Sequence, residues 1–192
     1  LLDRLIGTYT FGDIKITGIA DKHATDSSAA VYDFKRIIKE FDNIDITPPN
    51  NPRSWDHCLL LIETGDLKIL AWGDNRHNPP EEVWGAVNNV DIVLLPIDDS
   101  QHVISFPHAG EIIQRLSPSV IIPHHYYIFD VTVRQSTLQP ADGWLSTQSN
   151  VVRLTSPSAN YHPKDLIHAK NRIDFFDGHV AFDKKKWLSN SR

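Results

Sequence analysis

Two nearly uninterrupted apolar segments, with an amphipathic stretch between them, constrain the fold of this chain more than any other feature. Residues 91–97 (Asp-Ile-Val-Leu-Leu-Pro-Ile) and 120–123 (Val-Ile-Ile-Pro) lack the polar alternation of a half-exposed strand. Such runs are typical of strands that are buried on both faces of a sheet. Residues 106–116, which lie between them, space their apolar side chains along one helical face. The order strand, helix, strand therefore predicts a layered α/β sheet.

Alternation and turn residues predict the other elements. Residues 58–64 and 67–72 flank the turn sequence Gly-Asp and are expected to form a hairpin. A helix is expected to begin at Pro80, because proline suits a first turn and two acidic residues follow it. We further expect strands at residues 14–19 and 150–154, a strand or turn at 175–182, and either a helix or a pair of strands at 31–41.

The length and charge of the chain limit its organisation and its partners. A chain of 192 residues is long enough for one domain, which we expect to span residues 1–192. Residues 131–192, where the pattern weakens, are the candidate for a C-terminal extension. A net charge of -5 argues against a general nucleic-acid binder, which needs a basic surface. The chain has no apolar run of about 18 residues, so we expect no membrane partner.

The single cysteine and the missing sequence motifs narrow the function classes. Cys58 has no second cysteine with which to form an intramolecular disulfide, and a reducing compartment, the cytoplasm, is the simplest expectation. The chain contains no Gly-x-Ser-x-Gly segment, so a serine hydrolase with a nucleophile elbow is set aside. It also lacks the Gly-x-x-x-x-Gly-Lys loop of nucleotide-binding proteins.

Three polar residues follow predicted strands at the point where each strand ends. His23 follows the strand at 14–19, Asp74 follows the second strand of the hairpin, and His125 follows the apolar run at 120–123. Strand ends on one edge of a layered sheet converge, and ligands bind there. Each residue alone is more often a loop residue or a turn former. Together, two imidazoles and a carboxylate form a set that zinc, manganese or iron(II) accepts.

The segments around these residues resemble the metallo-β-lactamase superfamily, over roughly residues 10–130. Within it they look closest to the branch of the L-ascorbate-6-phosphate lactonase. The resemblance implies a four-layer αβ/βα sandwich, of which this chain would form mainly the C-terminal half. The segments that carry the resemblance are 18–23 (Gly-Ile-Ala-Asp-Lys-His), 70–76 (Leu-Ala-Trp-Gly-Asp-Asn-Arg), 90–97 (Val-Asp-Ile-Val-Leu-Leu-Pro-Ile) and 118–126 (Pro-Ser-Val-Ile-Ile-Pro-His-His-Tyr).

The resemblance also implies a ligand set. His23 would bind the first metal ion, Asp74 would bridge two ions and act in catalysis, and His125 would bind the second ion. His124 is the competing choice for that last role, although the spacing Pro-x-His-Tyr selects His125. The implied cofactor is a pair of zinc ions, with manganese and iron as alternatives.

One departure from the family concerns the His-x-His-x-Asp-His motif, which supplies further metal ligands and is absent from this chain. Two interpretations follow. The chain is a fragment that lacks an N-terminal segment, or it is a degenerate relative without catalysis. The chain begins with Leu1 and contains no methionine, which favours the fragment.

The sequence therefore predicts a metal-dependent hydrolase of a small, anionic lactone, amide or phosphoester, acting through a metal-bound hydroxide. The alternative is a metal-free binding or scaffold protein of the same fold. The expected partner is a small-molecule substrate, and a homo-oligomer is an open alternative. His57 has no partner pattern and is expected to be an ordinary residue, and His108 a structural one. The residues expected to contact the substrate or to orient the metal ligands are Asn75, Arg76, His77, Asp98, His102, His124 and Tyr126.

Overall fold

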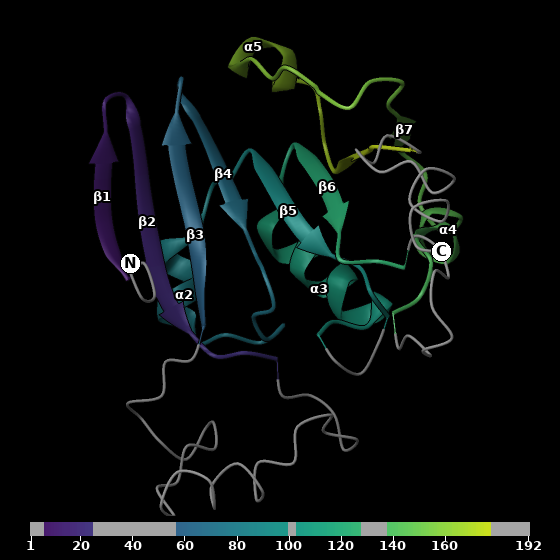
Figure 1. Cartoon of the computed structure of the whole chain (residues 1–192), viewed down its shortest axis with the longest axis horizontal. Helices are drawn as coiled ribbons and strands as arrows, with labels where there is room; N and C mark the ends of the chain where they lie inside the picture. The colour runs from purple at the N-terminus through teal and green to yellow at the C-terminus, as the bar shows by residue number, and fades with distance from the viewer. Residues whose placement is uncertain (1–5, 25–56, 100–102, 128–137, 178–192) are drawn as a thin grey trace, which may run out of the picture.

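The computed structural model describes residues 6–24, 57–99, 103–127 and 138–177. The described strands form one eight-stranded sheet in the order β1-β2-β3-β4-β5-β6-β8-β7 (Figure 1). The strands are β1 (Gly7–Phe11), β2 (Ile14–Asp21), β3 (His57–Thr64), β4 (Leu67–Ala71), β5 (Ile92–Pro96), β6 (Val120–His124), β7 (Val151–Arg153) and β8 (Arg172–Phe175). The helices are α2 (Glu81–Ala86), α3 (Phe106–Leu116), α4 (Ala141–Leu145) and α5 (Pro163–Leu166).

The sheet changes from antiparallel to parallel pairing at β4. Strands β1 to β4 pair antiparallel, whereas β4, β5, β6, β8 and β7 pair parallel. The hairpin between β3 and β4 turns at Gly65 and Asp66, which both have positive φ, as a two-residue hairpin turn requires. The predicted hairpin and the predicted α/β class are thus confirmed.

Helices α2 and α3 pack on one face of the sheet (Figure 1). The Oγ of Ser105 accepts a hydrogen bond from the backbone N–H of His108 and so caps the start of α3. Ser117, in a left-handed conformation, ends that helix. The buried side of α3, formed by Ala109 and Ile112 with Leu116, meets the apolar side chains of the central strands, as the helical spacing predicts.

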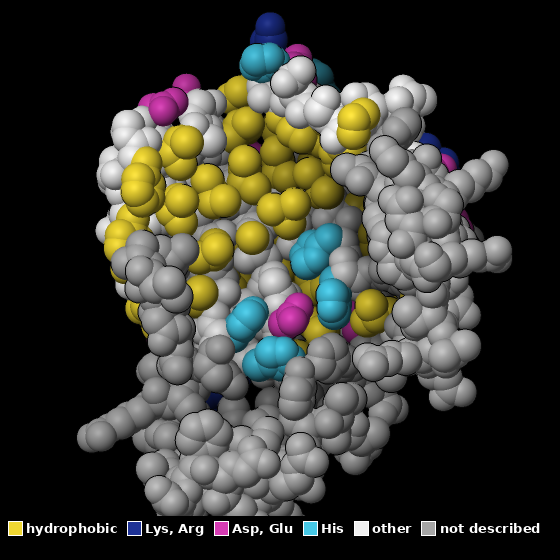
Figure 2. Space-filling view, viewed as in Figure 1, with side chains coloured by type: hydrophobic (Ala, Val, Ile, Leu, Met, Phe, Trp, Pro, Cys, Tyr) yellow, Lys and Arg dark blue, Asp and Glu magenta, His cyan; other side chains and the backbone are white. Residues whose placement is uncertain are grey.

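The opposite face of the sheet is also apolar. The register places Ile16, Ile62 and Ile69 in one row across three strands, and Figure 2 shows hydrophobic side chains gathered over this face. Leu166 and Tyr161, from α5 and the segment before it, cover one end of this face. Within the described part of the chain, this face carries α5 and no second sheet. That the chain forms mainly the C-terminal half of the sandwich stays a prediction.

Several details differ from the predictions. Strand β1 and helices α4 and α5 were not anticipated, and β8 begins at Arg172 rather than at the predicted residue 175. Strands β7 and β8 belong to the same sheet as the rest, with β8 paired to β6. The predictions for residues 31–41 and 178–182 lie outside the described residues. None of the described helices is long and apolar enough to span a membrane.

Candidate metal centre

The candidate centre begins at the sharp turn that follows β4. Gly73 has a φ of 60°, a left-handed conformation that glycine adopts at little cost. A Cβ at Gly73 would lie 3.1 Å from Nε2 of His57, so the neighbouring ring also requires a residue without a side chain. The backbone N–H of Asp74 donates to the same nitrogen at 3.1 Å. The turn thus anchors the backbone of Asp74 to the first residue of β3.

Asn75 holds this turn from the inside. Its side chain is fully buried, and its Nδ2 donates to the carbonyl oxygens of Cys58, at 3.1 Å, and of Trp72. In return, Nε1 of Trp72 donates to the carbonyl of Asn75 at 3.2 Å. The amide of Asn75 therefore braces the loop that carries Asp74, while the expectation that Asn75 contacts the substrate or orients the metal ligands stays a prediction.

A second set of backbone contacts joins the chain after β2 to the chain after β4. The backbone N–H of Ala24 donates to the carbonyl of Asp74 at 2.8 Å, and His23 forms an isolated antiparallel bridge with Asn75. These contacts extend the pairing of the sheet beyond the strand ends. As a result, the side chains of His23 and Asp74 lie next to each other.

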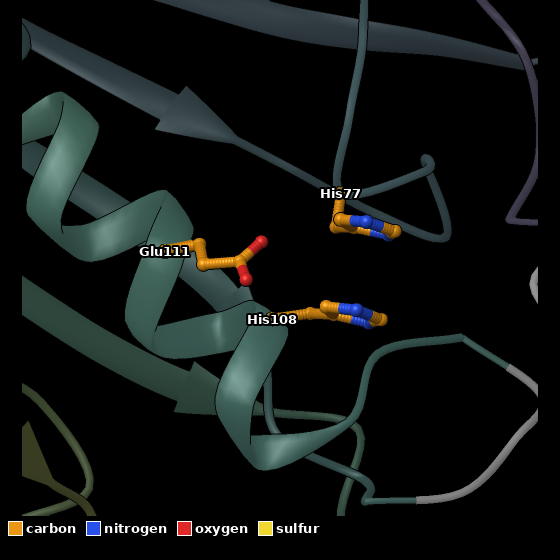
Figure 3. Close-up of side chains that lie close together, drawn as sticks. All are labelled: His77, His108 and Glu111. Carbon is orange, nitrogen blue, oxygen red and sulfur yellow. The ribbon is translucent and has the colours of Figure 1, made fainter.

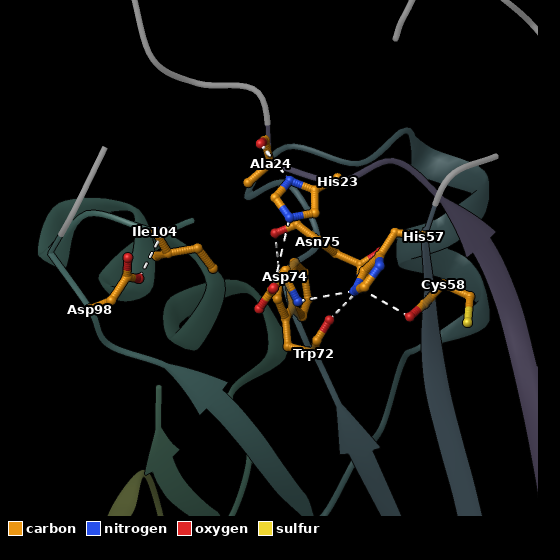
Figure 4. Close-up of polar contacts among 9 residues, drawn as sticks. All are labelled: His23, Ala24, His57, Cys58, Trp72, Asp74, Asn75, Asp98 and Ile104. Atoms are coloured by element: carbon orange, nitrogen blue, oxygen red, sulfur yellow. Dashed lines mark hydrogen bonds and ion pairs between the residues drawn. The ribbon is translucent and has the colours of Figure 1, made fainter. Parts of the chain in front are cut away.

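His23 and Asp74 form the centre of the site (Figure 4). Nε2 of His23 lies 3.7 Å from Oδ2 of Asp74, and both side chains are accessible, with relative exposures of 23% and 35%. Nδ1 of His23 lies 2.8 Å from the carbonyl oxygen of Ala24, which accepts a hydrogen bond from it in the neutral ring. A carbonyl oxygen only accepts, so Nδ1 carries a proton. In the neutral ring Nε2 then presents its lone pair to the site, and in the charged ring it donates to Asp74.

The surrounding histidines stabilise the charged form of Asp74. Its pKa is lowered chiefly by the interaction with His23, against the opposing effect of burial, and His125 and His57 add a favourable electrostatic contribution. The ring of His57 meets the ring of His23 edge to face, with centroids 5.6 Å apart. The site therefore keeps Asp74 ionised and so suited to a cation.

His124 is the last residue of β6 and His125 follows it, but the two differ in their surroundings. His125 has a φ of 55°, so the chain turns sharply at this residue. The pKa of His124 is lowered by burial and by the nearby charge of His125, which favours its neutral form. His125 thus interacts electrostatically with both Asp74 and His124.

The sequence of the chain matches one known protein family. Residues 3–125 match the model of the β-lactamase superfamily domain. The chain belongs to this family. The family membership confirms the resemblance to the superfamily, while assignment to the lactonase branch stays a prediction. A search of curated proteins finds no match to the chain.

Two solved structures are similar to this β-lactamase superfamily domain, and the first of them shares its fold. A Thermotoga maritima protein assigned as a Zn-dependent hydrolase of the metallo-β-lactamase superfamily is 20% identical, with a TM-score of 0.59 over 91% of this chain and 70% of that chain. A Parabacteroides distasonis protein assigned as a metal-dependent hydrolase is 15% identical, with a TM-score of 0.41 over 65% of this chain and 46% of that chain.

Arg76 of the β-lactamase superfamily domain is engaged with Asp21 at the end of β2. Its Nε and Nη2 atoms lie 2.9 and 2.7 Å from Oδ1 of Asp21, a carboxylate with no exposed surface. A buried carboxylate needs a partner of opposite charge. The structure therefore gives Arg76 a role in joining the two loops of the site, whereas the sequence suggested contact with an anionic substrate.

The acidic residues after β5 hold the loop that leads to α3. Oδ1 of the fully buried Asp98 accepts a hydrogen bond from the backbone N–H of Ile104 at 3.0 Å, and Oδ1 of Asp99 accepts one from Phe106 at 2.9 Å. These carboxylates satisfy backbone donors ahead of the helix, so Asp98 supports the loop. His102 lies outside the described residues.

The remaining two candidates lie in contact with other rings. Tyr126 lies beside Phe175, with ring centroids 5.6 Å apart, and burial raises the pKa of its hydroxyl. His77 stacks on His108 at the start of α3. Neither of these two contacts joins Asp74.

His57 stands in no sequence pattern that selects it, yet it contacts both Asp74 and His23. The expectation that it is an ordinary residue was wrong. Its position depends on the register of β2 and β3, which pairs His57 with Asp21. A histidine at the start of a strand, beside the strand that leads to the candidate ligand His23, is the one signal that the sequence offers.

Proposed function

We propose that this domain is a metal-dependent hydrolase whose cation is held by His23, Asp74 and His125. The observation that carries the proposal is the position of Nε2 of His23, 3.7 Å from Oδ2 of an accessible Asp74. The influence of His125 on the same carboxylate supports its inclusion. Membership of the β-lactamase superfamily domain family adds to the case.

The donors fit a divalent metal in type and in protonation state. Two imidazole nitrogens and one carboxylate form a common ligand set for zinc, with manganese and iron as alternatives. A ligand imidazole must be neutral, and the hydrogen bond from Nδ1 of His23 favours the tautomer that offers Nε2. When bound, the ion would supply Lewis acidity and a water molecule of lowered pKa. A pair of ions would need further ligands from outside this set.

The protein's own groups supply orientation and proton transfer. The carboxylate of Asp74 is partly exposed and its charged form is stabilised, so it is positioned to accept a proton from water. The contact of His57 with the backbone of Asp74 and the pair formed by Arg76 and Asp21 keep the two loops in register. These contacts position the site rather than touch the substrate.

The substrate class that we propose is a small, anionic lactone, amide or phosphoester. A cation held by the histidines and the carboxylate at the strand ends would provide the positive charge that an anionic substrate needs. The branch of the L-ascorbate-6-phosphate lactonase, to which the sequence looks closest, agrees with such a substrate. The competing proposal is a metal-free binding protein of the same fold.

Metal content and hydrolysis together test the proposal. We would measure zinc, manganese and iron in the full chain by elemental analysis, beside His125→Ala and the exposed control His168→Ala. We expect bound metal in the wild type and the control, a clear loss in His125→Ala, and hydrolysis of at least one lactone, amide or phosphoester. Absence of metal and of hydrolysis in all three proteins would favour the metal-free binding protein.

A further inference from the structure

A second cluster of metal-binding side chains lies outside the candidate centre. His77, from the loop after β4, lies beside His108 and Glu111 of α3, and Figure 3 shows the two rings parallel, one above the other, with the carboxylate next to them. Each offers one ligand atom, and these atoms all lie within 4.8 Å of one another. The two rings are half-buried and the carboxylate is exposed, so an ion can reach the cluster from solvent.

We propose that His77, His108 and Glu111 form a second divalent-metal site, separate from the site at Asp74. His108 and Glu111 are three residues apart on one helix and therefore lie on one side of it. A carboxylate and a histidine with this spacing recur in helical metal sites. The third ligand, His77, comes from a different element, so the ion would link the loop after β4 to the first turns of α3.

The rings of His77 and His108 lie in an arrangement that two imidazoles alone do not prefer. Their centroids are 3.5 Å apart and their planes differ by 2°, which is a face-to-face arrangement. Aromatic rings prefer an offset or an edge-to-face arrangement, and two protonated imidazoles in this position would repel each other. A metal ion requires both rings to be neutral. Because an imidazole binds a metal in its ring plane, two parallel rings can share one ion only after one of them rotates.

Only small movements separate this cluster from a coordinating one. Ligand atoms around a tetrahedral zinc ion lie about 3.4 Å apart, as follows from bond lengths of about 2.1 Å. The ligand atoms of the cluster lie up to 4.8 Å apart, so the widest separation has to decrease by roughly 1.4 Å. Rotation of one imidazole about its Cβ–Cγ bond, a torsion with a broad minimum, and of the exposed Glu111 side chain provides this movement.

The donor set indicates the class of metal. Two imidazoles and one carboxylate favour late first-row ions, with copper(II) bound most tightly and nickel, zinc and cobalt suitable. Magnesium and calcium prefer all-oxygen sites and are not expected here. The described cluster contains no thiol, so bound cobalt(II) would show the spectrum of nitrogen and oxygen ligands.

Titration of the full chain with zinc and cobalt separates the two sites. We would compare the wild type with His108→Ala, Glu111→Gln, His125→Ala and the control His168→Ala, and measure stoichiometry and affinity by calorimetry and cobalt absorption. We expect His108→Ala to lose one equivalent of metal and Glu111→Gln to bind that equivalent at least about tenfold more weakly. His125→Ala should retain it, whether or not the site at Asp74 binds metal.

The exposed position of Glu111 keeps the test informative if His108→Ala does not fold. Unchanged stoichiometry and affinity in Glu111→Gln would overturn the proposal, and so would wild-type binding in a folded His108→Ala. The loss of the same equivalent in both variants, with retention in His168→Ala, would support it.

Discussion

The backbone N–H of Asp74 donates to Nε2 of His57, and this bond commits the ring nitrogen as an acceptor. The proton of the neutral ring must then lie on Nδ1. His57 consequently holds the backbone beside the candidate ligand and is not itself a ligand through Nε2. The carboxylate of Asp74 and its backbone are thus positioned by two different histidines, His23 and His57.

Replacement of His57 should weaken metal binding more than it weakens folding. In His57→Ala the backbone donor of Asp74 loses its partner, at a cost of about 1 kcal/mol in the free energy of unfolding. Loss of a group that orients a metal ligand typically lowers metal affinity about 10- to 100-fold. Urea unfolding and zinc calorimetry measure the two effects, with the exposed His162→Ala as control. Equal zinc affinities in His57→Ala and wild type would contradict this role.

A side chain at position 73 should destabilise the domain. Gly73→Ala forces a left-handed conformation on alanine, which costs about 1–2 kcal/mol, and brings the new Cβ close to His57. The matched control is Gly85→Ala on an exposed side of α2, where a Cβ meets nothing within 4 Å. In Gly85→Ala the free energy of unfolding should rise by up to about 1 kcal/mol, because alanine favours a helix more than glycine does. Urea unfolding compares the two, and equal effects of the same sign would refute the argument.

The elements with a strong local pattern were predictable. The apolar runs identified β5 and β6, and the helical spacing identified α3, because their side chains face the core on both sides or along one stripe. Strand β1 was missed because most of its residues are exposed, so no burial pattern marks it. Helices α4 and α5 have five and four residues, too few for a helical period to be seen.

The roles of the polar residues were harder to predict than their positions. Asn75 and Arg76 follow a strand end, as ligands and substrate contacts do, yet one braces the loop and the other neutralises buried Asp21. The sequence does not tell whether such a residue turns inward or outward. The stacking of His77 on His108 depends on where α3 meets the loop after β4, a tertiary contact that no local pattern reports.

Removal of the positive partner of Asp21 should be severely destabilising. Arg76→Met leaves a carboxylate with no exposed surface without its guanidinium, and breaking a buried pair in this way costs about 3–5 kcal/mol. The double variant Asp21→Asn with Arg76→Met should recover part of this loss, because the buried charge that Arg76 neutralises is gone. Urea unfolding of the single and double variants measures the coupling.

The control for the ion pair of Asp21 and Arg76 is an exposed ion pair on the helical side of the sheet. Arg115 and Glu81 form an ion pair with side-chain exposures of 44% and 79%, and such pairs contribute about 0–1 kcal/mol. Arg115→Met should therefore change the free energy of unfolding far less than Arg76→Met does. Similar losses in the two variants would mean that the burial of Asp21 is not what makes its pair important.

Cys58 should react slowly with alkylating reagents at neutral pH. Burial raises the pKa of its thiol, so the reactive thiolate is populated only at a pH above that of an exposed cysteine. The thiol of Cys58 ionises more readily in the unfolded chain than in the folded one. The contribution of the protonated thiol to the stability of the fold is therefore present below the pKa of the unfolded chain, and it is lost as pH rises through the pKa of the folded chain. Iodoacetamide labelling followed by mass spectrometry is unambiguous, since the chain has 1 cysteine. The native rate should reach its midpoint at higher pH than the rate in urea, and coincident midpoints would refute the effect of burial.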